Sequence, residues 1–544
     1  MSTNLPTRAL RPLLVPLSCL LLNACTPLAA VLSGSQDLVT LKPVSATGLE
    51  RTSPTPGSKD KTVTPLSVGG SAFPHGYVVR APSELVFRLN GNCDRLNVRI
   101  GLDDQTRSQN ALTFQVFADD QKRFDSGPVR SGQAARPVQV DVMGAQTMRL
   151  VVSGEADARA DWLTPTLTCE PWGGPIVITQ GGTYSGAWES TDPNTPAVIV
   201  RTSDPVTITR SRIRGVGHYG LIEGTGNRLT VTNTVFEGQR PRIRGRSAPM
   251  AVSLFQARRL TFEHNVVRQQ GGVRLTQWQG QASDGDTVRI RYNLASNIDG
   301  RQDDGFGNPI TSGERTITNF VQFNQVQGIS GAEIAWNQVI NTPYQSLVED
   351  NINMYLSSGV KDSPIKIHDN YIQGAYNADP AHDARYAGGG ILLGDGKSER
   401  LGDNGYQWAY NNRVVGTANY ALGVLGGLEN RLYDNRAIGS GLLPDGRPIA
   451  SQNTGLVVWN MYKAGAGLFG NNSVKSNAVA WNSRVRSSQT SPSPWYIPDC
   501  DKQGNTCDNT NLGLASPEQE QAEFSQWQKA LRDAGIQLGT TVTD

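Results

Sequence analysis

A motif of about ten residues recurs along residues 170–490, and this repeat constrains the fold more than any other feature of the chain. Residues 206–215 return as residues 229–238, with an apolar pair two positions apart, a small polar residue, then another apolar residue. Further copies begin at Leu260, Val288, Ala332, Ile365, Gln407, Asn430 and Gly467. Successive copies are offset by 23, 31, 28, 44, 33, 42, 23 and 37 residues. Such a repeat indicates a stack of similar supersecondary units.

The shortest offset, 23 residues, suits one coil of three short parallel strands joined by tight bends. Asn occupies the bend position at 265, 293, 337, 370, 412, 435 and 472. Asn tolerates the left-handed conformation and can hydrogen bond to the next Asn along a stack. A β-propeller would need a more constant period of about 40 residues. The pattern resembles the right-handed parallel β-helix, the fold of pectate lyases and polygalacturonases, and we predict that fold for residues 170–490.

Composition excludes several classes of protein. The 544 residues include 50 basic and 48 acidic ones, so net charge gives no reason to expect binding to nucleic acid or to an anionic membrane. The 58 Gly and 30 Pro make the chain rich in turns, but their share is below that of low-complexity chains. With 38% hydrophobic residues the chain can form cores, which excludes a disordered chain.

Residues 63–169 alternate apolar and polar residues in short runs separated by turns, which is typical of a β-sandwich. The segments RAPSELV at 80–86, IGLDD at 100–104, FDSG at 124–127 and ADW at 160–162 are similar to the NPCBM family, with Arg80 where its members usually have His. The resemblance implies a jelly-roll-like module that binds carbohydrate. Its Asp103, Asp104 and Asp161 either shape turns or hold a structural calcium ion, and the sequence leaves both roles open.

The N-terminus has the pattern of an export signal. Arg8 and Arg11 precede an apolar run that is too short to cross a hydrocarbon core of about 30 Å. The run ends in LNAC, which resembles the lipobox of bacterial lipoproteins and implies lipidation of Cys25 after removal of residues 1–24. Cleavage near residues 29–30 is the alternative. We expect an exported lipoprotein at the cell envelope, on the outer membrane or cell surface, with residues 25–62 as a flexible tether.

Four further cysteines fit an oxidising compartment, because no spacing among them suggests zinc. Of the three pairings that four cysteines allow, Cys93 with Cys169 and Cys500 with Cys507 keeps each disulfide within one structural unit. In the tail, 491–544, Ser516 and Pro517 mark the start of a helix that we expect to cap the open end of the coils. The predicted fold class is thus all-β, with a β-sandwich, a right-handed parallel β-helix and a short C-terminal capping helix.

Candidate chemistry lies where the coils carry polar residues on their outer face. The densest segment is EDNINMY at 349–355, in which a strand would direct Ile352 and Met354 inward. Three glycines at 388–390 clear space on the next coil before Asp395. The candidate catalytic residues are Asp350, Asp395, Glu349, Asp379 and His382, and the candidate ligand-binding residues are Asn351, Asn353, Tyr355, Gln322, Asn324, Arg385 and Trp459.

Three functions compete for this cluster. A glycoside hydrolase needs an acid and a base or nucleophile about 5–9.5 Å apart, which Asp350 and Asp395 with Glu349 or Asp379 can supply. A polysaccharide lyase needs a base beside a uronate and a cation for its carboxylate, for which His382, Arg385 and Lys361 are available. In the third interpretation the groove only binds. The sequence favours an exported, lipid-anchored envelope protein that binds polysaccharide, with a degrading enzyme as the alternative and calcium as the one cofactor left open.

A second feature is a row of arginines in the segment QRPRIRGR at 239–246. An extended loop would present Arg240, Arg242, Arg244 and Arg246 to a polyanion, which makes a structural or polyanion-binding envelope protein a further alternative. No aromatic residue interrupts the run, so stacking on single-stranded nucleic acid is not supported and we do not expect nucleic acid as a partner. The competing interpretation is a solvated loop whose arginines pair with Asp299, Asp303 or Asp304.

Overall fold

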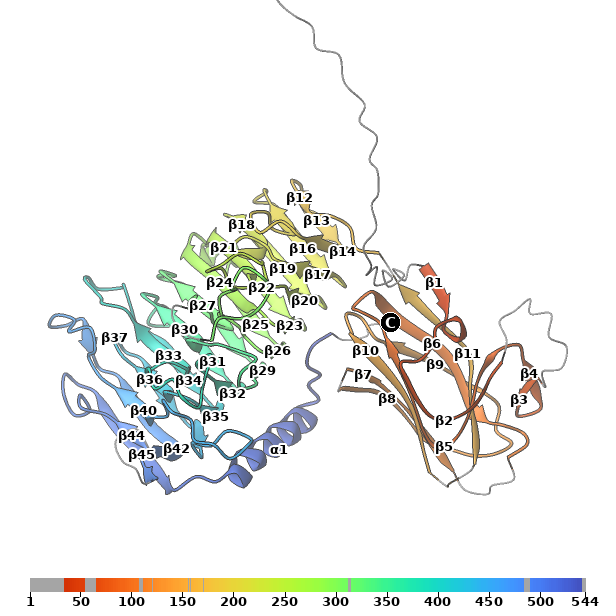
Figure 1. Cartoon of the computed structure of the whole chain (residues 1–544). Helices are drawn as coiled ribbons and strands as arrows, with labels where there is room; N and C mark the ends of the chain where they lie inside the picture. Colours follow the sequence, from red (N-terminus) through yellow and green to blue (C-terminus); the bar gives the residue numbers. More distant parts are fainter. Residues whose placement is uncertain are drawn as a thin grey trace, which may run out of the picture.

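The computed structural model describes residues 34–53, 65–106, 111–119, 121–154, 156, 158–169, 171–311, 315–483 and 490–540. Figure 1 shows an antiparallel β-sandwich beside one long parallel β-helix, with a single α-helix, α1 (Pro517–Ala534), near the C-terminus. The predicted signal peptide, Cys25 and residues 54–62 of the tether lie outside the described residues. In the described part of the chain, no helix is both long and apolar enough to span a membrane.

The β-sandwich is a nine-stranded antiparallel sheet that folds over on itself. Strand β5 (Gly76–Arg88) pairs with β11 (Arg159–Cys169) through its first half and with β10 (Thr147–Ser153) through its second half. The two layers enclose one core, in which Phe114 packs edge-on against Trp162. The other strands are β1 Gly34–Asp37, β2 Ser45–Thr52, β6 Cys93–Leu102, β7 Leu112–Ala118, β8 Gln121–Val129 and β9 Arg136–Asp141, with a separate hairpin of β3 Leu66–Val68 and β4 Ser71–Phe73.

The prediction of a flexible tether is wrong for residues 34–53. Strand β1 pairs with β11, and β2 pairs with β5. Between them the 3-10 helix η1 (Leu38–Thr40) places Leu38 in the core of the sandwich, where its carbonyl accepts a 2.7 Å hydrogen bond from the Tyr77 hydroxyl. The polar composition of this segment suggested a tether because β2 has no buried residue and so shows no apolar pattern. One buried leucine and main-chain pairing are enough to add this segment to the sheet.

The β-helix follows the predicted arrangement of three short strands per coil. One parallel sheet of eleven strands takes one strand from each coil, and a second sheet of 21 strands takes the others. The eleven-stranded sheet comprises β12 Ile176–Ile178, β15 Val198–Val200, β18 Gly220–Thr225, β21 Met250–Ala257, β24 Gly271–Trp278, β27 Val321–Asn324, β30 Asp350–Tyr355, β33 Gly389–Asp395, β36 Tyr420–Val424, β40 Thr454–Val458 and β44 Trp495–Tyr496. Buried Ile, Val, Leu and Phe side chains fill the interior along the whole stack.

The larger sheet winds around the remaining sides of the coils. Its strands are β13 Gly182–Tyr184, β14 Ala187–Ser190, β16 Pro205–Thr209, β17 Arg212–Gly215, β19 Arg228–Thr232, β20 Val235–Gly238, β22 Arg259–Glu263, β23 Val266–Arg268, β25 Val288–Arg291, β26 Leu294–Ser296, β28 Glu333–Ala335, β29 Gln338–Ile340, β31 Ile365–His368, β32 Tyr371–Ala375, β34 Gln407–Tyr410, β35 Arg413–Thr417, β38 Arg431–Tyr433, β39 Arg436–Gly439, β42 Ser473–Ser483, β43 Ser491–Pro492 and β45 Thr506–Gly513. A two-stranded ribbon of β37 Gly427–Leu428 and β41 Phe469–Gly470 and the 3-10 helix η2 Ala282–Asp284 complete the coils.

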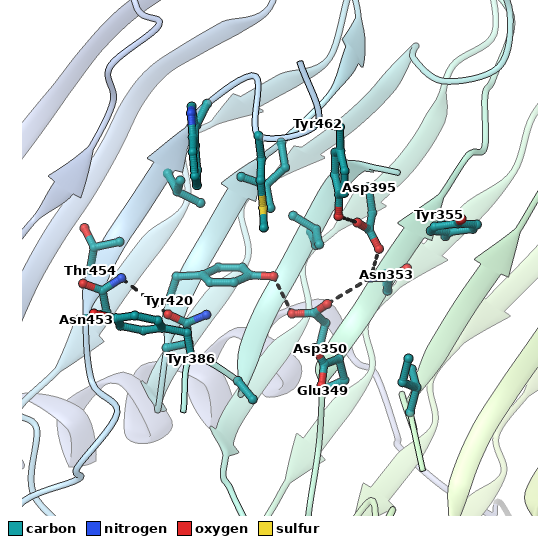
Figure 2. A pocket seen from close by; sticks show the side chains of 18 of the residues that line it. Glu349, Asp350, Asn353, Tyr355, Tyr386, Asp395, Tyr420, Asn453, Thr454 and Tyr462 are labelled. Carbon is teal, nitrogen blue, oxygen red and sulfur yellow. Dashed lines mark hydrogen bonds between the residues drawn. The ribbon is translucent and has the colours of Figure 1, made fainter. Parts of the chain in front are cut away.

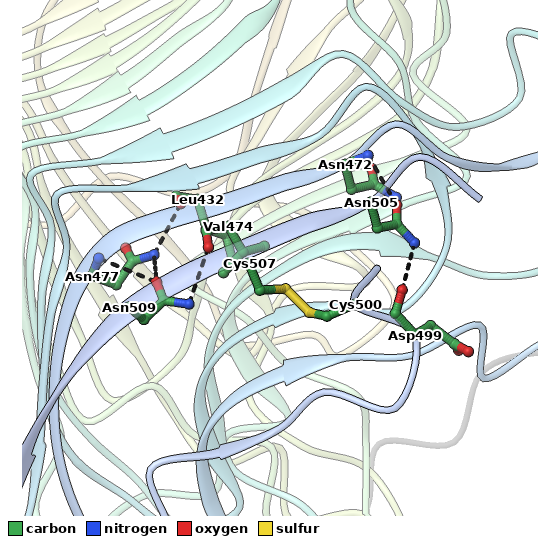
Figure 3. The surroundings of a disulfide bond; sticks show 9 residues. All are labelled: Leu432, Asn472, Val474, Asn477, Asp499, Cys500, Asn505, Cys507 and Asn509. Carbon is green, nitrogen blue, oxygen red and sulfur yellow. Dashed lines mark hydrogen bonds between the residues drawn. A yellow bond between two sulfur atoms is a disulfide. The ribbon is translucent and has the colours of Figure 1, made fainter. Parts of the chain in front are cut away.

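The recurring Asn residues form a buried ladder along the stack. Each side-chain amide donates to the Oδ1 of the Asn on the next coil at 2.8–2.9 Å, through the series Asn293, Asn337, Asn370, Asn412, Asn435, Asn477 and Asn509. Two details differ from the prediction. Asn472 belongs to a second ladder with Asn505 (Figure 3). From Asn293 to Asn477 the left-handed residue is the one before each ladder Asn, such as Tyr292 with φ 59°.

Both predicted disulfides are present, Cys93–Cys169 in the sandwich and Cys500–Cys507 at the last coil (Figure 3). The predicted helix α1 begins at a capping box made by Ser516 and Gln519. It does not cover the open end of the coils. Phe524 and Trp527 instead pack against the side of the stack on Tyr371, because that coil carries an apolar residue on its outer face.

The sandwich contacts the first coils of the β-helix through charged side chains. Arg212 of β17 forms a 3.0 Å ion pair with Asp94 of the sandwich and lies over the ring of Trp172. Arg268 of β23 forms a 3.3 Å ion pair with Asp119. The side chain of Arg212 is 2% exposed, so this contact excludes water. The two hydrophobic cores remain separate, and polar groups join them.

Candidate functional site

A pocket of about 820 Å³ lies on the outer face of the eleven-stranded sheet. Strands β27, β30, β33, β36, β40 and β44 and the loops around them form it, as Figure 2 shows from close by. Its lining residues are Ile317, Gln322, Asn324, Glu349, Asp350, Asn353, Tyr355, Tyr386, Ala387, Leu392, Asp395, Asn419, Tyr420, Leu425, Asn453, Thr454, Val457, Trp459, Met461, Tyr462 and Tyr496.

Strand β30 directs polar side chains into the pocket because its apolar ones face the core. Ile352 and Met354 are fully buried inside the coil, so Asn353 and Tyr355 point outward. On the next coil β33 pairs with β30 in parallel and places Gly389 beside Asp350. A Cβ atom at Gly389 would overlap the carboxylate of Asp350. The lack of a side chain at Gly389 therefore leaves space for the carboxylate of Asp350, as the sequence predicted.

Two carboxylates face each other across one amide. The Nδ2 of Asn353 donates at 2.9 Å to Oδ2 of Asp350 and at 2.9 Å to Oδ2 of Asp395. The nearest oxygens of the two carboxylates are therefore no more than about 6 Å apart, which suits the paired carboxylates of glycoside hydrolases. The hydroxyl of Tyr420 donates to Asp350, and that of Tyr462 donates to Asp395 (Figure 2).

The surroundings of Asp350 and Glu349 raise the pKa of both carboxyl groups above the usual range. Burial raises the pKa of Asp350 to about 7, and the neighbouring charge of Glu349 adds to the increase. The hydrogen bond from Tyr420 opposes this shift because it stabilises the carboxylate. Burial also raises the pKa of Glu349, against the attraction of its ion-pair partner Arg315. An acid that is still partly protonated near neutral pH thus lies beside other carboxyl groups.

Aromatic side chains form much of the wall around the acids. Trp459 and Tyr496 are 38% and 40% exposed and meet edge to face, with ring centroids 5.8 Å apart. Tyr355 and Tyr386 line other parts of the pocket. Flat apolar surfaces beside a few polar groups are the usual lining of a small-molecule site, and sugar rings offer both kinds of surface.

Most of the predicted site residues meet in this pocket, and four do not. Those that line it are Gln322, Asn324, Glu349, Asp350, Asn353, Tyr355, Asp395 and Trp459. Asn351 is fully buried. The alternation of inward and outward side chains is broken at the start of β30, where both Asn351 and Ile352 point inward. The side chain of Asn351 donates to the carbonyl of Gly374 at 3.0 Å and accepts from Asn341. The prediction of a ligand-binding Asn351 is therefore wrong.

The loop before β33 contributes Tyr386 and Ala387 to the pocket, but not its charged residues. His382 hydrogen bonds at 3.0 Å to Asp379 on the same loop, and its side chain is 73% exposed. Arg385 pairs with Asp383 two residues away. The loop bonds within itself, so the predicted catalytic roles of Asp379 and His382 and the ligand contact of Arg385 have no support from this geometry.

The four arginines of residues 239–246 do not form one row toward solvent. Arg240 pairs with Asp299 at 2.7 Å, and Arg246 donates to the carbonyl of Pro193 at 2.7 Å. Arg242 and Arg244 are exposed. The ion pair of Arg240 with Asp299 agrees with the competing interpretation, in which the arginines pair with the neighbouring acidic insert. Two guanidinium groups, and not four, are left exposed.

Sequence reasoning missed Tyr420, the phenol that contacts Asp350. The contact of Tyr420 with Asp350 depends on which residue of the following coil pairs with Gly389. The variable offset between copies hides that register from the sequence. Within the described ranges, no group of three or more His, Cys, Asp or Glu side chains is arranged to hold a metal ion.

The sandwich has recognisable relatives. Residues 37–168 match the model of the NPCBM/NEW2 domain. A protein of Renibacterium salmoninarum that is named for endo-alpha-N-acetylgalactosaminidase activity is 26% identical over 118 residues. That match covers 21% of this chain, and the chain spans only 8% of the relative's length. The expected NPCBM resemblance is confirmed, and the matched segment begins before the predicted start at residue 63.

Two solved structures are similar in part. The CBM51 module of a Clostridium perfringens GH95 protein, in complex with methyl-galactose, is 26% identical and covers 25% of this chain and 99% of its own, with a TM-score of 0.22. The catalytic domain of a GH87 alpha-1,3-glucanase in complex with tetrasaccharides is 12% identical and covers 88% of this chain and 100% of its own, with a TM-score of 0.31.

Within the NPCBM/NEW2 domain, two of the three noted aspartates shape turns. Asp104 accepts from the backbone amides of Gly69 and Gly70, and Asp103 accepts from the amide of Gln105. Asp161 is fully buried, and burial together with the charge of Asp103 raises its pKa to about 8. A calcium ion at these aspartates stays a prediction.

Proposed function

We propose that this protein binds a polysaccharide and hydrolyses a glycosidic bond in the pocket over β30 and β33. The observation that carries the proposal is the pair of carboxylates that share the amide of Asn353, one of them with a pKa raised to about 7. An acid with a raised pKa that lies close to a second carboxylate is what acid and base catalysis of this reaction requires.

The roles follow from the environments of the two acids. Asp350, protonated near neutral pH, donates its proton to the glycosidic oxygen as the bond to the sugar breaks. Asp395 receives a hydrogen bond from Tyr462, which suits an ionised group. It either removes a proton from the attacking water or attacks the sugar carbon itself, and water then releases the product. Asn353 holds both carboxylates in register.

The charge of the pocket favours hydrolysis over elimination. Among the described residues that line it there are three acids, Glu349, Asp350 and Asp395, and no Lys, Arg or His. A lyase needs a base beside a uronate and a cation to neutralise the uronate carboxylate. Because none of the described lining residues is a cation that could neutralise a uronate carboxylate, we propose a neutral or amino sugar at the scissile bond. Residues 37–168 supply a second contact to glycan, as their NPCBM/NEW2 match supports.

The test uses residues 26–544 with neutral polysaccharides (dextran, alpha-1,3-glucan and galactan) and with polygalacturonate. Gel filtration follows polymer size over hours, with and without calcium. We expect a neutral polymer to be shortened, and Asp350→Asn and Asp395→Asn each to lower the rate by about 10²–10⁴-fold while the polymer is still bound. Asp379→Asn is the matched control, because that aspartate lies outside the pocket. Co-elution with intact polymer in every case would make the protein a binding protein only.

We further infer export and lipid anchoring at the cell envelope, which the LNAC motif at residues 22–25 supports. A Cys25→Ser variant expressed in a bacterial host should lose metabolic labelling with palmitate and leave the membrane fraction. Unchanged labelling would contradict the inference and leave the hydrolase proposal untouched.

A further inference from the structure

We propose that a second cavity on the same face of the β-helix is a distal subsite, which binds sugar units of the polymer whose scissile bond lies between Asp350 and Asp395. This inference rests on the proposed function and adds to it a binding site and a mode of action. The cavity measures about 700 Å³ and lies over β15, β18, β21 and β24. Its most exposed aromatic residues are Tyr219 and Phe255.

The register of the eleven-stranded sheet connects this cavity to the acids. Phe255 pairs with Thr276, Thr276 with Asn324, Asn324 with Tyr355, and Tyr355 with Asp395. These five residues therefore form one row across neighbouring strands. Four strand spacings of about 4.8 Å place Phe255 ~19 Å from Asp395. An extended chain of several sugar units spans such a distance.

The two cavities are adjacent. Asn324 lines both of them. In the neighbouring row, Arg274 of the distal cavity donates from Nε at 2.8 Å to Oε1 of Gln322, which lines the central pocket. This hydrogen bond fixes a side chain of the distal cavity to a side chain of the central pocket. A single polymer that follows the sheet meets both sites, so we take the occupant of both to be the same glycan.

The aromatic residues of the distal cavity are presented for contact. Phe255 is 42% exposed and Tyr219 is 62% exposed, although both lie on an ordered coil. The carboxylate of Glu223 accepts from the backbone amides of Tyr219 and Gly220 at 2.7 and 2.9 Å. This anchors the turn that carries Tyr219. Fixed, exposed rings beside polar groups provide a platform for sugar rings at low entropic cost.

The proposal predicts that the enzyme acts within long chains and that affinity rises with chain length. The test compares wild-type protein with a Tyr219→Ala, Phe255→Ala double variant on the polymer that is cleaved and on its trimer. Loss of two aromatic contacts to the sugar chain should lower kcat/KM on the polymer by about tenfold or more, because the apolar ring surface that a bound sugar would cover is removed. The trimer, which cannot reach both sites, should be cleaved at the wild-type rate.

The control is Phe306→Ala, an 83% exposed aromatic residue outside both cavities. Equal losses on polymer and trimer, or no loss on either, would overturn the distal subsite and leave the hydrolase proposal standing. If no polymer is shortened, the hydrolase proposal fails instead. The subsite is then judged by affinity electrophoresis in gels that contain the same neutral polymers. Weaker retardation of the double variant than of the Phe306→Ala control supports the subsite, and equal or absent retardation overturns it.

Discussion

At the scale of single residues, Asp350 is the acid of the pocket whose environment is best defined. It is 5% exposed, accepts hydrogen bonds from Asn353 and Tyr420, and lies beside the carboxylate of Glu349. Burial and like charge raise its pKa, and the hydrogen bonds lower it. The balance near 7 makes this residue a candidate acid at neutral pH, and each neighbour can be removed separately.

The pH dependence of kcat/KM tests this balance. Catalysis requires protonated Asp350, so kcat/KM should fall as pH rises through about 7. Tyr420→Phe removes a hydrogen bond that stabilises the carboxylate, which raises the pKa of Asp350 and moves the alkaline limb to higher pH. Glu349→Gln removes a like charge, which lowers that pKa and moves the limb to lower pH. Shifts in the same direction for both variants would contradict the assignment of the limb to Asp350.

Part of this site follows from the sequence, and part does not. Strict alternation in β30 predicts that Asn353 and Tyr355 point outward. The three successive glycines at 388–390 predict an open space beside them. Alternation also predicts an outward Asn351, which fails because two successive residues turn inward at the start of the strand. Tyr420 was missed because contacts between coils depend on a register that variable loops conceal.

At the scale of the element, the Asn ladder shows how a repeat determines a fold. Every interior member is buried and both donates and accepts along the stack, so each coil satisfies polar groups of the next. The period of the repeat and its Asn were enough to predict a β-helix. The place of α1 on the side of the stack was not predictable, because it depends on the outward-facing Tyr371 of one coil.

The ladder makes a prediction about stability. Asn412→Ala removes a fully buried side chain that donates to Asn435 and accepts from the backbone amide of Asn370, and it leaves that buried amide without its acceptor. The free energy of unfolding should fall by about 1–3 kcal/mol, measured by urea denaturation. Asn509→Ala is the matched control, because it ends the same ladder and is only half-buried. An equal loss in the two variants would mean that position in the ladder does not matter.

At the scale of the whole molecule, the NPCBM/NEW2 domain and the β-helix are joined by polar contacts between two separate cores. Arg212 pairs with Asp94, lies over Trp172 and donates to the carbonyl of Gly91. Because the side chain is almost fully buried, its loss leaves these groups without their partner. The contact holds the NPCBM/NEW2 domain beside the coils that carry the distal cavity. Its purpose, in our proposal, is to keep polymer within reach of the groove.

Arg212→Ala tests whether this arrangement matters for function. We expect the radius of gyration from small-angle X-ray scattering to increase slightly, since the module is then held less tightly but keeps the ion pair of Arg268 with Asp119. Cleavage of a soluble trimer should not change, because the pocket over β30 and β33 contains none of the altered contacts. Cleavage of an insoluble polymer should fall several-fold, because a loosely held module presents the chain to the groove less often. Arg99→Ala, at an exposed position of the same module, is the control. A normal radius of gyration together with slower cleavage of the trimer would instead show that Arg212 acts through the fold of the β-helix itself.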